Sequence, residues 1–224
     1  FKDYIIEQGI VKSKLTYYPY YAESFYKKAS PPNEIKSKFS EGLNILFAGN
    51  IGVAQSFDTI LQSAKILKES INNFTFIILG EGRDKKRVQE EIKKMNLDKH
   101  FSFLGSYPPE DMSNYFACAD ALLVSLRDTK IFSYTIPGKL QSYLACGRPI
   151  IASLNGIGAK IIEDSQCGFV SKSEDPNGLA DSVLCLNKLD KKQKEKLGDN
   201  AINYYKKEFE RTYLLNRLIN IFEK

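Results

Sequence analysis

Residues Tyr134–Ser153 read YTIPGKLQSYLACGRPIIAS, a pattern that predicts, in order, a loop, a helix, a glycine turn and a buried strand. Pro137 is favoured in the first turn of a helix, where its missing N–H group is not needed. Leu140, Tyr143 and Leu144 follow at helical spacing and give that helix one apolar face. A glycine then ends the helix, and the segment PIIAS predicts a short strand.

The same alternation of apolar strands and helices extends from this segment in both directions. Each expected strand is apolar on both faces, which is typical of a parallel sheet covered by helices on both sides. We therefore predict a doubly wound, Rossmann-like α/β domain, in which ligands bind at the carboxyl ends of the strands. The expected strands are Leu43–Ala48, Phe74–Leu79, Phe101–Leu104, Ala121–Ser125, Ile150–Ala152 and Gly168–Val170.

The spacing of apolar residues between and after these strands predicts the connecting helices. Besides the helix after Pro137, one helix begins at about Ala54. The others are Arg83–Met95, Glu110–Cys118, Ala159–Asp164, Pro176–Leu186, Lys191–Phe209 and Arg211–Phe222.

The residues before the first strand form a less regular pattern. Residues 1–8 are typical of a helix end, Leu15–Tyr18 of a short strand, and Lys27–Ser40 of a linker with a short helix. The chain opens FKDYIIEQ without an initiator methionine, so we expect a fragment of a longer protein. The expected division is 1–40 as an interdomain link with a terminal helix remnant, 41–209 as the Rossmann-like domain, and 210–224 as a C-terminal helix.

Composition excludes several classes of function. The net charge is +5, but the lysines alternate with Glu and Asp, which favours solvated helix faces over a nucleic-acid surface. His100 is the single histidine, which excludes a multi-histidine metal site. The four cysteines lack CxxC spacing, which favours reduced thiols in a cytoplasmic protein. No apolar run of about 18 residues occurs, so the sequence predicts no membrane span.

Lys139 is unusual because it lies in the first turn of its predicted helix. A cation there opposes the helix dipole, which favours anions at a helix N-terminus. The position is understandable if an anion lies between the lysine and the helix amides. Lys139 therefore predicts an anion-binding site at the edge of the sheet.

Glycine-rich turns follow several of the expected strands, where backbone N–H groups can approach a phosphate or a sugar. Gly49-Asn50-Ile51-Gly52 follows the first strand, but it is not GxGxxG and does not support a nicotinamide or flavin site. Gly156-Ile157-Gly158 precedes a helix and offers its amides to an anion. Together with Lys139 it predicts a diphosphate cradle, although each turn is also compatible with a tight connection.

Polar side chains follow two further strands. Arg83, which closes the turn Gly80-Glu81-Gly82-Arg83, predicts an anion contact at a helix start, and a solvated arginine is the alternative. Ser106 and Tyr107 follow the third strand, where a tyrosine can cover the face of a base. Packing of Tyr107 against the prolines that follow it is the alternative there.

Four segments, in this order, resemble the C-terminal, donor-binding domain of GT-B glycosyltransferases of family 4, also called glycosyltransferase group 1. They are FAGNIGVAQ at 47–55, ILGEG at 78–82, FLG at 103–105 and IPGKLQSYLACGRPI at 136–150. The subgroup that builds bacterial surface polysaccharides, including enzymes similar to the N-acetylfucosaminyl transferase of O-antigen and capsule pathways, is most similar. YPYYAE at 18–23 resembles the interdomain link of that subgroup, and the resemblance covers about residues 15–208.

The resemblance implies retaining transfer from a UDP- or GDP-sugar, with no cofactor or essential metal, in the cytoplasm or at the inner face of the cell membrane. A saccharide or lipid-linked acceptor would bind an absent N-terminal domain, toward which the last helix would cross. Nucleic acid is not an expected partner, and the catalytic acid or base is expected in the absent domain. The implied donor contacts are Gly49, Asn50, Gln55, Gly82, Arg83, Ser106, Tyr107, Pro137, Lys139, Ser142, Gly156 and Gly158.

Two pairs of residues depart from the family pattern. Asn50 and Gln55 stand where many members carry an arginine and a lysine that contact the diphosphate. Tyr134 and Ser142 stand where many members carry two glutamates, of which the second holds the ribose hydroxyls. Lys139 and the helix amides are then expected to carry more of the diphosphate charge.

Two other functions are alternatives to a transferase. A non-catalytic sugar-nucleotide-binding module, or a degenerate paralogue, would explain the loss of both glutamates. A nonhydrolysing sugar-nucleotide epimerase shares the two-domain architecture, but the carboxylates and histidines it would need are not evident in this sequence.

Overall fold

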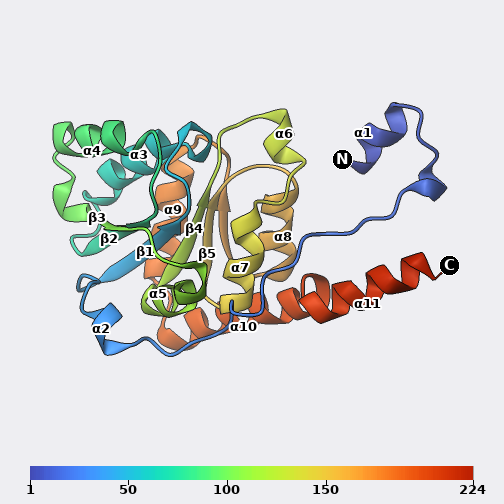
Figure 1. Cartoon of the computed structure of the whole chain (residues 1–224). Helices are drawn as coiled ribbons and strands as arrows, with labels where there is room; N and C mark the ends of the chain where they lie inside the picture. Colours follow the sequence, from blue (N-terminus) through green and yellow to red (C-terminus); the bar gives the residue numbers. More distant parts are fainter. Residues whose placement is uncertain (224) are drawn as a thin grey trace.

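A six-stranded, fully parallel sheet lies at the centre of the molecule, with helices on both faces (Figure 1). The computed structural model describes residues 1–223, with only the backbone for Asp3. The strand order is β3-β2-β1-β4-β5-β6, so the order reverses between β1 and β4. The strands are β1 (Leu43–Ala48), β2 (Phe74–Leu79), β3 (Phe101–Gly105), β4 (Ala121–Ser125), β5 (Ile150–Ser153) and β6 (Gly168–Ser171). The predicted doubly wound α/β fold is thus confirmed.

Burial on both sides explains why the strands read as continuous apolar runs. In β1, Ile45 and Phe47 belong to one core, while Leu46 belongs to the other. The first core is covered by α3 (Phe57–Leu67), α4 (Lys85–Lys94) and α9 (Pro176–Asn187). The second is covered by α5 (Met112–Cys118), α7 (Gly138–Cys146), α8 (Ile157–Ser165) and α10 (Lys191–Glu208).

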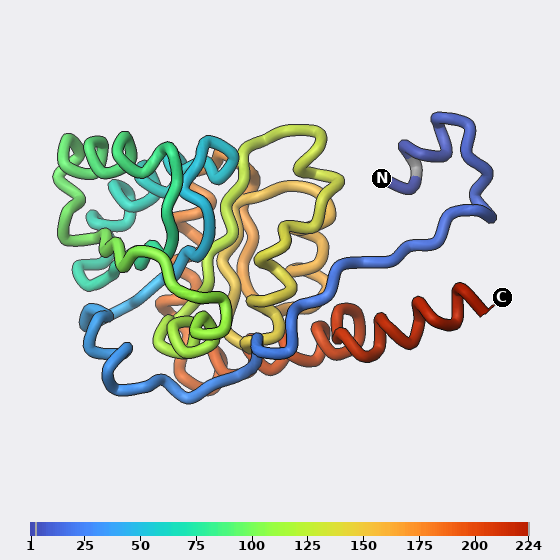
Figure 2. The backbone as a smooth tube through the Cα atoms, in the orientation of Figure 1, coloured from blue at the N-terminus to red at the C-terminus, as the bar shows by residue number. Residues whose placement is uncertain are grey.

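Followed back from β1 toward the N-terminus, the chain runs along the face of the sheet that carries the second core and then leads away from the sheet (Figure 2). It contains α1 (Lys2–Glu7) and α2 (Asn33–Lys36). The predicted strand at Leu15–Tyr18 is wrong, because this segment is extended but pairs with no strand. Instead, the carbonyl oxygen of Tyr17 accepts a hydrogen bond of 2.6 Å from Arg217 on α11 (Arg211–Phe222).

Several helix boundaries differ from the predictions by a few residues. Pro137 is the N-cap of α7, immediately before its first turn. The helix predicted from Arg83 begins at Lys85. The short helix α6 (Lys130–Ser133) forms inside a predicted loop, where the side chain of its N-cap Thr129 accepts a bond from a backbone N–H group.

The loops after β1 and β2 approach each other backbone to backbone at the carboxyl edge of the sheet. The Gly49 amide donates to Leu79, and the Ile51 amide donates to Glu81. Gly80 has φ of 138°, and a Cβ atom there would collide with the Gly49 carbonyl group. This contact requires glycine for both its conformation and its size.

Replacing Gly80 with alanine should therefore destabilise the fold by about 2 kcal/mol or more, because strain and collision add. Gly138→Ala is the matched control, since no atom lies within 4 Å of its Cβ position and its φ is not positive. Urea unfolding of both variants measures the difference. Equal stability of the two variants would show that the loops can separate at little cost.

Candidate functional site

A cleft of about 520 Å³ lies at the carboxyl ends of β1, β2 and β3, beside the switch in strand order. Its walls come from the loops after these strands, from α5 and α7, and from the segment before β1. The lining residues are Tyr26, Ala48, Gly49, Asn50, Leu79, Gly80, Glu81, Ser106, Tyr107, Pro109, Met112, Phe116, Gly138, Lys139, Ser142 and Tyr143.

The ammonium group of Lys139 is buried in this cleft. Among the residues that the structure describes, no group accepts a hydrogen bond from its Nζ atom. Nζ lies 3.7 Å from the centre of the Phe47 ring, and a Cβ atom on Gly49 would stand 3.1 Å from it. Contact with an aromatic face offsets only part of the desolvation of an ammonium group. Burial accordingly lowers the pKa of Lys139 to about 7.

Tyr143, one turn after Lys139 on α7, fixes this helix against the end of β1. The hydroxyl oxygen of Tyr143 accepts a bond of 2.9 Å from the Ala48 amide. The ring packs edge-on against Phe116 with centroids 5.1 Å apart. Burial raises the pKa of the Tyr143 phenol, so this side chain remains a neutral tether.

One wall of the cleft is aromatic and comes from distant parts of the chain. Tyr26 stacks on Phe116 of α5, with ring centroids 6.4 Å apart and planes at 9°. Burial raises the pKa of the Tyr26 phenol, and hydrogen bonding to Ser142 opposes this rise. Ser142 therefore lies where α7 and the segment before β1 meet.

The β3 end of the cleft carries Tyr107 beside Tyr115, with ring centroids 4.4 Å apart. Between the β3 end and Lys139, Glu81 follows β2 and forms an ion pair of 2.6 Å with Lys85 on α4. Among residues 1–223, Glu81 is the only carboxylate that lines the cleft. The cleft thus has an aromatic end, a middle where the carboxylate of Glu81 is paired with Lys85, and a basic end at Lys139.

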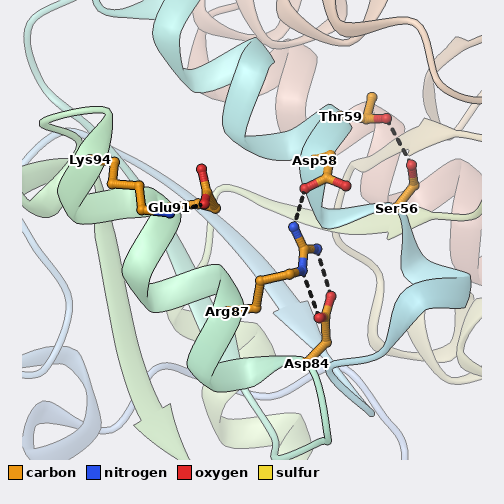
Figure 3. Close-up of polar contacts among 7 residues, drawn as sticks. All are labelled: Ser56, Asp58, Thr59, Asp84, Arg87, Glu91 and Lys94. Carbon is orange, nitrogen blue, oxygen red and sulfur yellow. Dashed lines mark hydrogen bonds and ion pairs between the residues drawn. The ribbon is translucent and has the colours of Figure 1, made fainter.

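Arg87, another cation near this edge of the sheet, is already neutralised. Arg87 donates to Asp84 and to Asp58, at distances of 2.6 to 2.7 Å (Figure 3). The bond to Asp84 and the bond to Asp58 raise the pKa of Arg87, and Arg87 in turn lowers the pKa of Asp84. Arg87 lies outside the cleft described above. Lys139 differs from it in having no such partner.

The structure brings half of the predicted site residues into this cleft. These are Gly49, Asn50, Ser106, Tyr107, Lys139 and Ser142. The other six, which do not line it, are Gln55, Gly82, Arg83, Pro137, Gly156 and Gly158.

Most of these six have a visible structural role. The Gln55 amide, oriented to satisfy its neighbours, donates to the carbonyl groups of Asn50 and Gly52 and so braces the loop after β1. A Cβ atom on Gly82 would collide with the backbone of Ile51. Arg83 is exposed to solvent.

The predicted turn at 156–158 also differs from the expectation. Gly156 is the N-cap of α8, with φ of 74°, and a Cβ atom there would collide with the Ser133 carbonyl group. Gly158 lies inside α8, and a Cβ atom on it would stand 3.1 Å from the Pro137 ring. Both glycines therefore allow α8 to pack against the segment that precedes α7.

Several lining residues were not assigned from the sequence. Glu81 stands inside the predicted turn Gly80-Glu81-Gly82-Arg83, but no sequence pattern indicates a role for its carboxylate. Tyr143 was assigned to the apolar face of its helix. Tyr26 gave no local signal, because it reaches the cleft from a segment that resembles a linker.

Within residues 1–223, no three His, Cys, Asp or Glu side chains gather where they could hold a metal ion. Among the helices described there, none combines the length and the apolar character needed to cross a membrane.

The family model described as glycosyl transferases group 1 matches residues 32–204. The chain therefore belongs to this family. It is 26% identical over 151 residues to the 2-deoxystreptamine N-acetyl-D-glucosaminyltransferase of Niallia circulans. This match covers 67% of this chain and 38% of that protein. It is also 24% identical over 155 residues to the amylovoran biosynthesis glycosyltransferase AmsK of Erwinia amylovora, a match that covers 69% of this chain and 38% of AmsK. The chain thus spans about two fifths of these curated relatives.

Solved structures show the same fold. HepE of Anabaena, crystallised with UDP and glucose, superposes with a TM-score of 0.79 at 14% identity, over 100% of this chain and 60% of HepE. The C-terminal domain of the group 1 glycosyltransferase LpcC from Francisella tularensis superposes with a TM-score of 0.68 at 19% identity, over 84% of this chain and 97% of that domain. The predicted Rossmann-like domain of a GT-B glycosyltransferase is confirmed.

The buried ammonium of Lys139 predicts a distinct pH dependence of stability. Because its pKa falls from 10.5 to about 7 on folding, the unfolded state binds more protons between these two values. The free energy of unfolding should therefore rise with pH across this window as the burial penalty is relieved. Lys139→Met removes the cost of burying the ammonium group, so this variant should be more stable than the parent chain at low pH. The difference in the free energy of unfolding should shrink by about 3 kcal/mol from pH 6.5 to 9.5, because the parent chain loses the same cost as Lys139 is deprotonated.

Urea unfolding at both pH values measures this change. Lys65→Met on the exposed part of α3 is the matched control, and it should change little with pH. A Lys139→Met advantage that does not depend on pH would show that the ammonium keeps its ordinary pKa in the fold.

Proposed function

We propose that the cleft binds the nucleoside diphosphate part of a sugar nucleotide, and that the whole protein transfers the sugar to an acceptor. The observation that carries this proposal is Lys139, a buried cation whose Nζ has no hydrogen-bond acceptor among the described residues. A buried ammonium is costly unless an anion joins it. A diphosphate in the cleft would supply that anion.

The backbone around Lys139 suits a diphosphate. Lys139 and Gly138 form the first turn of α7, where amides lack intrahelical partners and favour negative charge. Gly49, at the end of β1, leaves the space in front of Nζ open. As the bond between the sugar and the diphosphate breaks, fixed amides and the buried lysine would stabilise the negative charge that develops on the leaving diphosphate.

The opposite end of the cleft suits the nucleoside. Tyr107 offers an aromatic ring on which a base can stack, and Ser106 adds a polar group beside it. Glu81 lies on the loop between these residues and Gly49, at the end of the middle strand of the three. We infer that the base lies toward β3 and the diphosphate toward β1 and α7.

The nature of the reaction rests on the family and the relatives. The family is one of glycosyltransferases, and the similarity to AmsK, which is named for amylovoran biosynthesis, supports a role in bacterial surface polysaccharide synthesis. We propose a UDP- or GDP-sugar donor and retaining transfer without a metal, in the cytoplasm or at the inner face of the membrane. A saccharide or lipid-linked acceptor would bind a second domain of the whole protein, since the relatives are longer than this chain.

A non-catalytic binding module is the second candidate. Asn50 and Gln55 favour it because they are neutral where many family members carry basic residues. Tyr134 favours it because it stands where many members carry a glutamate, and it packs against Phe1 outside the cleft. Turnover by the whole protein with a sugar nucleotide and acceptor separates this candidate from a transferase.

Calorimetric titration of this chain with UDP and GDP should show binding of at least one of them. Lys139→Met should weaken that binding about 10- to 100-fold, because a charge-assisted hydrogen bond contributes about 1.5 to 3 kcal/mol. Lys65→Met, which removes an exposed lysine, should bind like the parent chain. Unchanged affinity in Lys139→Met would refute the role of Lys139, and no binding at millimolar nucleotide would refute the proposed function.

A further inference from the structure

We propose that Lys38, which lies outside the cleft, is a positioning residue that holds the Tyr107 ring as a platform for the nucleobase. The inference rests on the proposed function, which places the base at the β3 end of the cleft. It assigns a role to a residue in the segment before β1.

The contacts form a closed cluster of three side chains. The Nζ atom of Lys38 donates to the Tyr107 hydroxyl at 3.3 Å and to the Tyr115 hydroxyl at 3.4 Å. The two rings lie 4.4 Å apart at 34°. One ammonium group thus bridges both phenols while the rings pack on each other, so the orientation of Tyr107 is fixed at its hydroxyl and along one face.

The cluster connects an anchored ring to a ring in a loop. Tyr115 lies on α5 and is 3% exposed, so the protein core holds it in place. Tyr107 belongs to the loop after β3, where its neighbours Ser106 and Pro108 are exposed. Tyr107 is therefore the member whose orientation depends on the other two.

Lys38 itself is held by its neighbours in sequence. Ile35 and Phe39 pack against the second core, and the Lys38 amide donates to the Ile35 carbonyl group. The Lys38 side chain is exposed and leaves this anchored turn to reach Tyr107. Its role in the fold is consequently small, while its contact with a lining residue of the cleft is direct.

The contact with Lys38 also affects the pKa of the Tyr107 phenol, which can be measured by absorbance. Hydrogen bonding to Tyr115 and to Lys38 lowers the pKa of the Tyr107 phenol, whereas burial raises the pKa of Tyr115. Loss of Lys38 should thus move the Tyr107 titration to higher pH. This readout reports the contact without any ligand.

A ring that is already oriented binds a base without losing rotational freedom, and this preorganisation raises affinity. Loss of Lys38 should therefore weaken binding of ligands that carry a base. It should not affect ligands that consist of phosphate alone, because the proposed phosphate contacts lie at the other end of the cleft. A loss of affinity for the ligands that carry a base, without a loss for phosphate alone, indicates that Lys38 positions Tyr107. Equal losses for both kinds of ligand would indicate a general effect of its charge.

The experiment compares Lys38→Met, Lys38→Arg and Lys36→Met, the last removing an exposed lysine from α2 nearby. Calorimetry measures affinity for UDP and for pyrophosphate. Lys38→Met should weaken UDP binding about 5- to 10-fold and leave pyrophosphate unchanged. Lys38→Arg should restore UDP binding to within about twofold, since a guanidinium can donate to both hydroxyls. Lys36→Met should match the parent chain.

The phenol titration, followed by tyrosinate absorbance with Tyr107→Phe as reference, should show a raised pKa for Tyr107 in Lys38→Met. Equal UDP affinity in Lys38→Met and the parent chain, equal losses for UDP and pyrophosphate, or an unmoved Tyr107 titration would each overturn the inference. A parent chain that binds neither UDP nor pyrophosphate would overturn the proposed function itself, and the inference with it.

Discussion

The contact between the loops after β1 and β2 is the constraint on which the cleft depends. The two loops meet backbone to backbone because Gly80 and Gly82 leave no side chain between them and the opposite loop. Two backbone hydrogen bonds extend the pairing of β1 and β2 beyond the ends of the strands. The floor of the cleft is therefore built from peptide groups that are held together by their own hydrogen bonds.

The second determinant is the burial of a cation that the fold itself does not satisfy. Tyr143 fixes α7 against the end of β1, and this places the Lys139 ammonium over the Phe47 ring. Desolvation opposes the charged form of such a group, and an aromatic face compensates it only in part. Arg87 shows the ordinary alternative, in which two carboxylates neutralise a cation near the same edge. A binding site and a structural ion pair thus differ in whether the protein supplies the counter-charge.

Much of the fold could be predicted from the sequence, because two-sided burial makes each strand a continuous apolar run. The strand expected at Leu15–Tyr18 failed, since local composition does not reveal whether a partner strand is available. Topology also placed Gly49, Ser106 and Tyr107 at the cleft, because residues after neighbouring parallel strands share one edge. It could not give the direction of side chains such as Gln55, nor a contact made by Tyr26 across most of the domain. The division of the chain into domains stays a prediction.

The walls of the cleft come from widely separated parts of the chain, from Tyr26 before β1 to Tyr143 on α7. Domains fold during synthesis as the chain emerges, at about 5 to 20 residues per second. The strands β1, β2 and β3 emerge before α7, so the loops after β1 and β2 can pair with each other before α7 and Lys139 emerge. Every residue that lines the cleft has been made once residue 143 has left the ribosome, before β5, β6 and α8 to α10 of the same domain have followed.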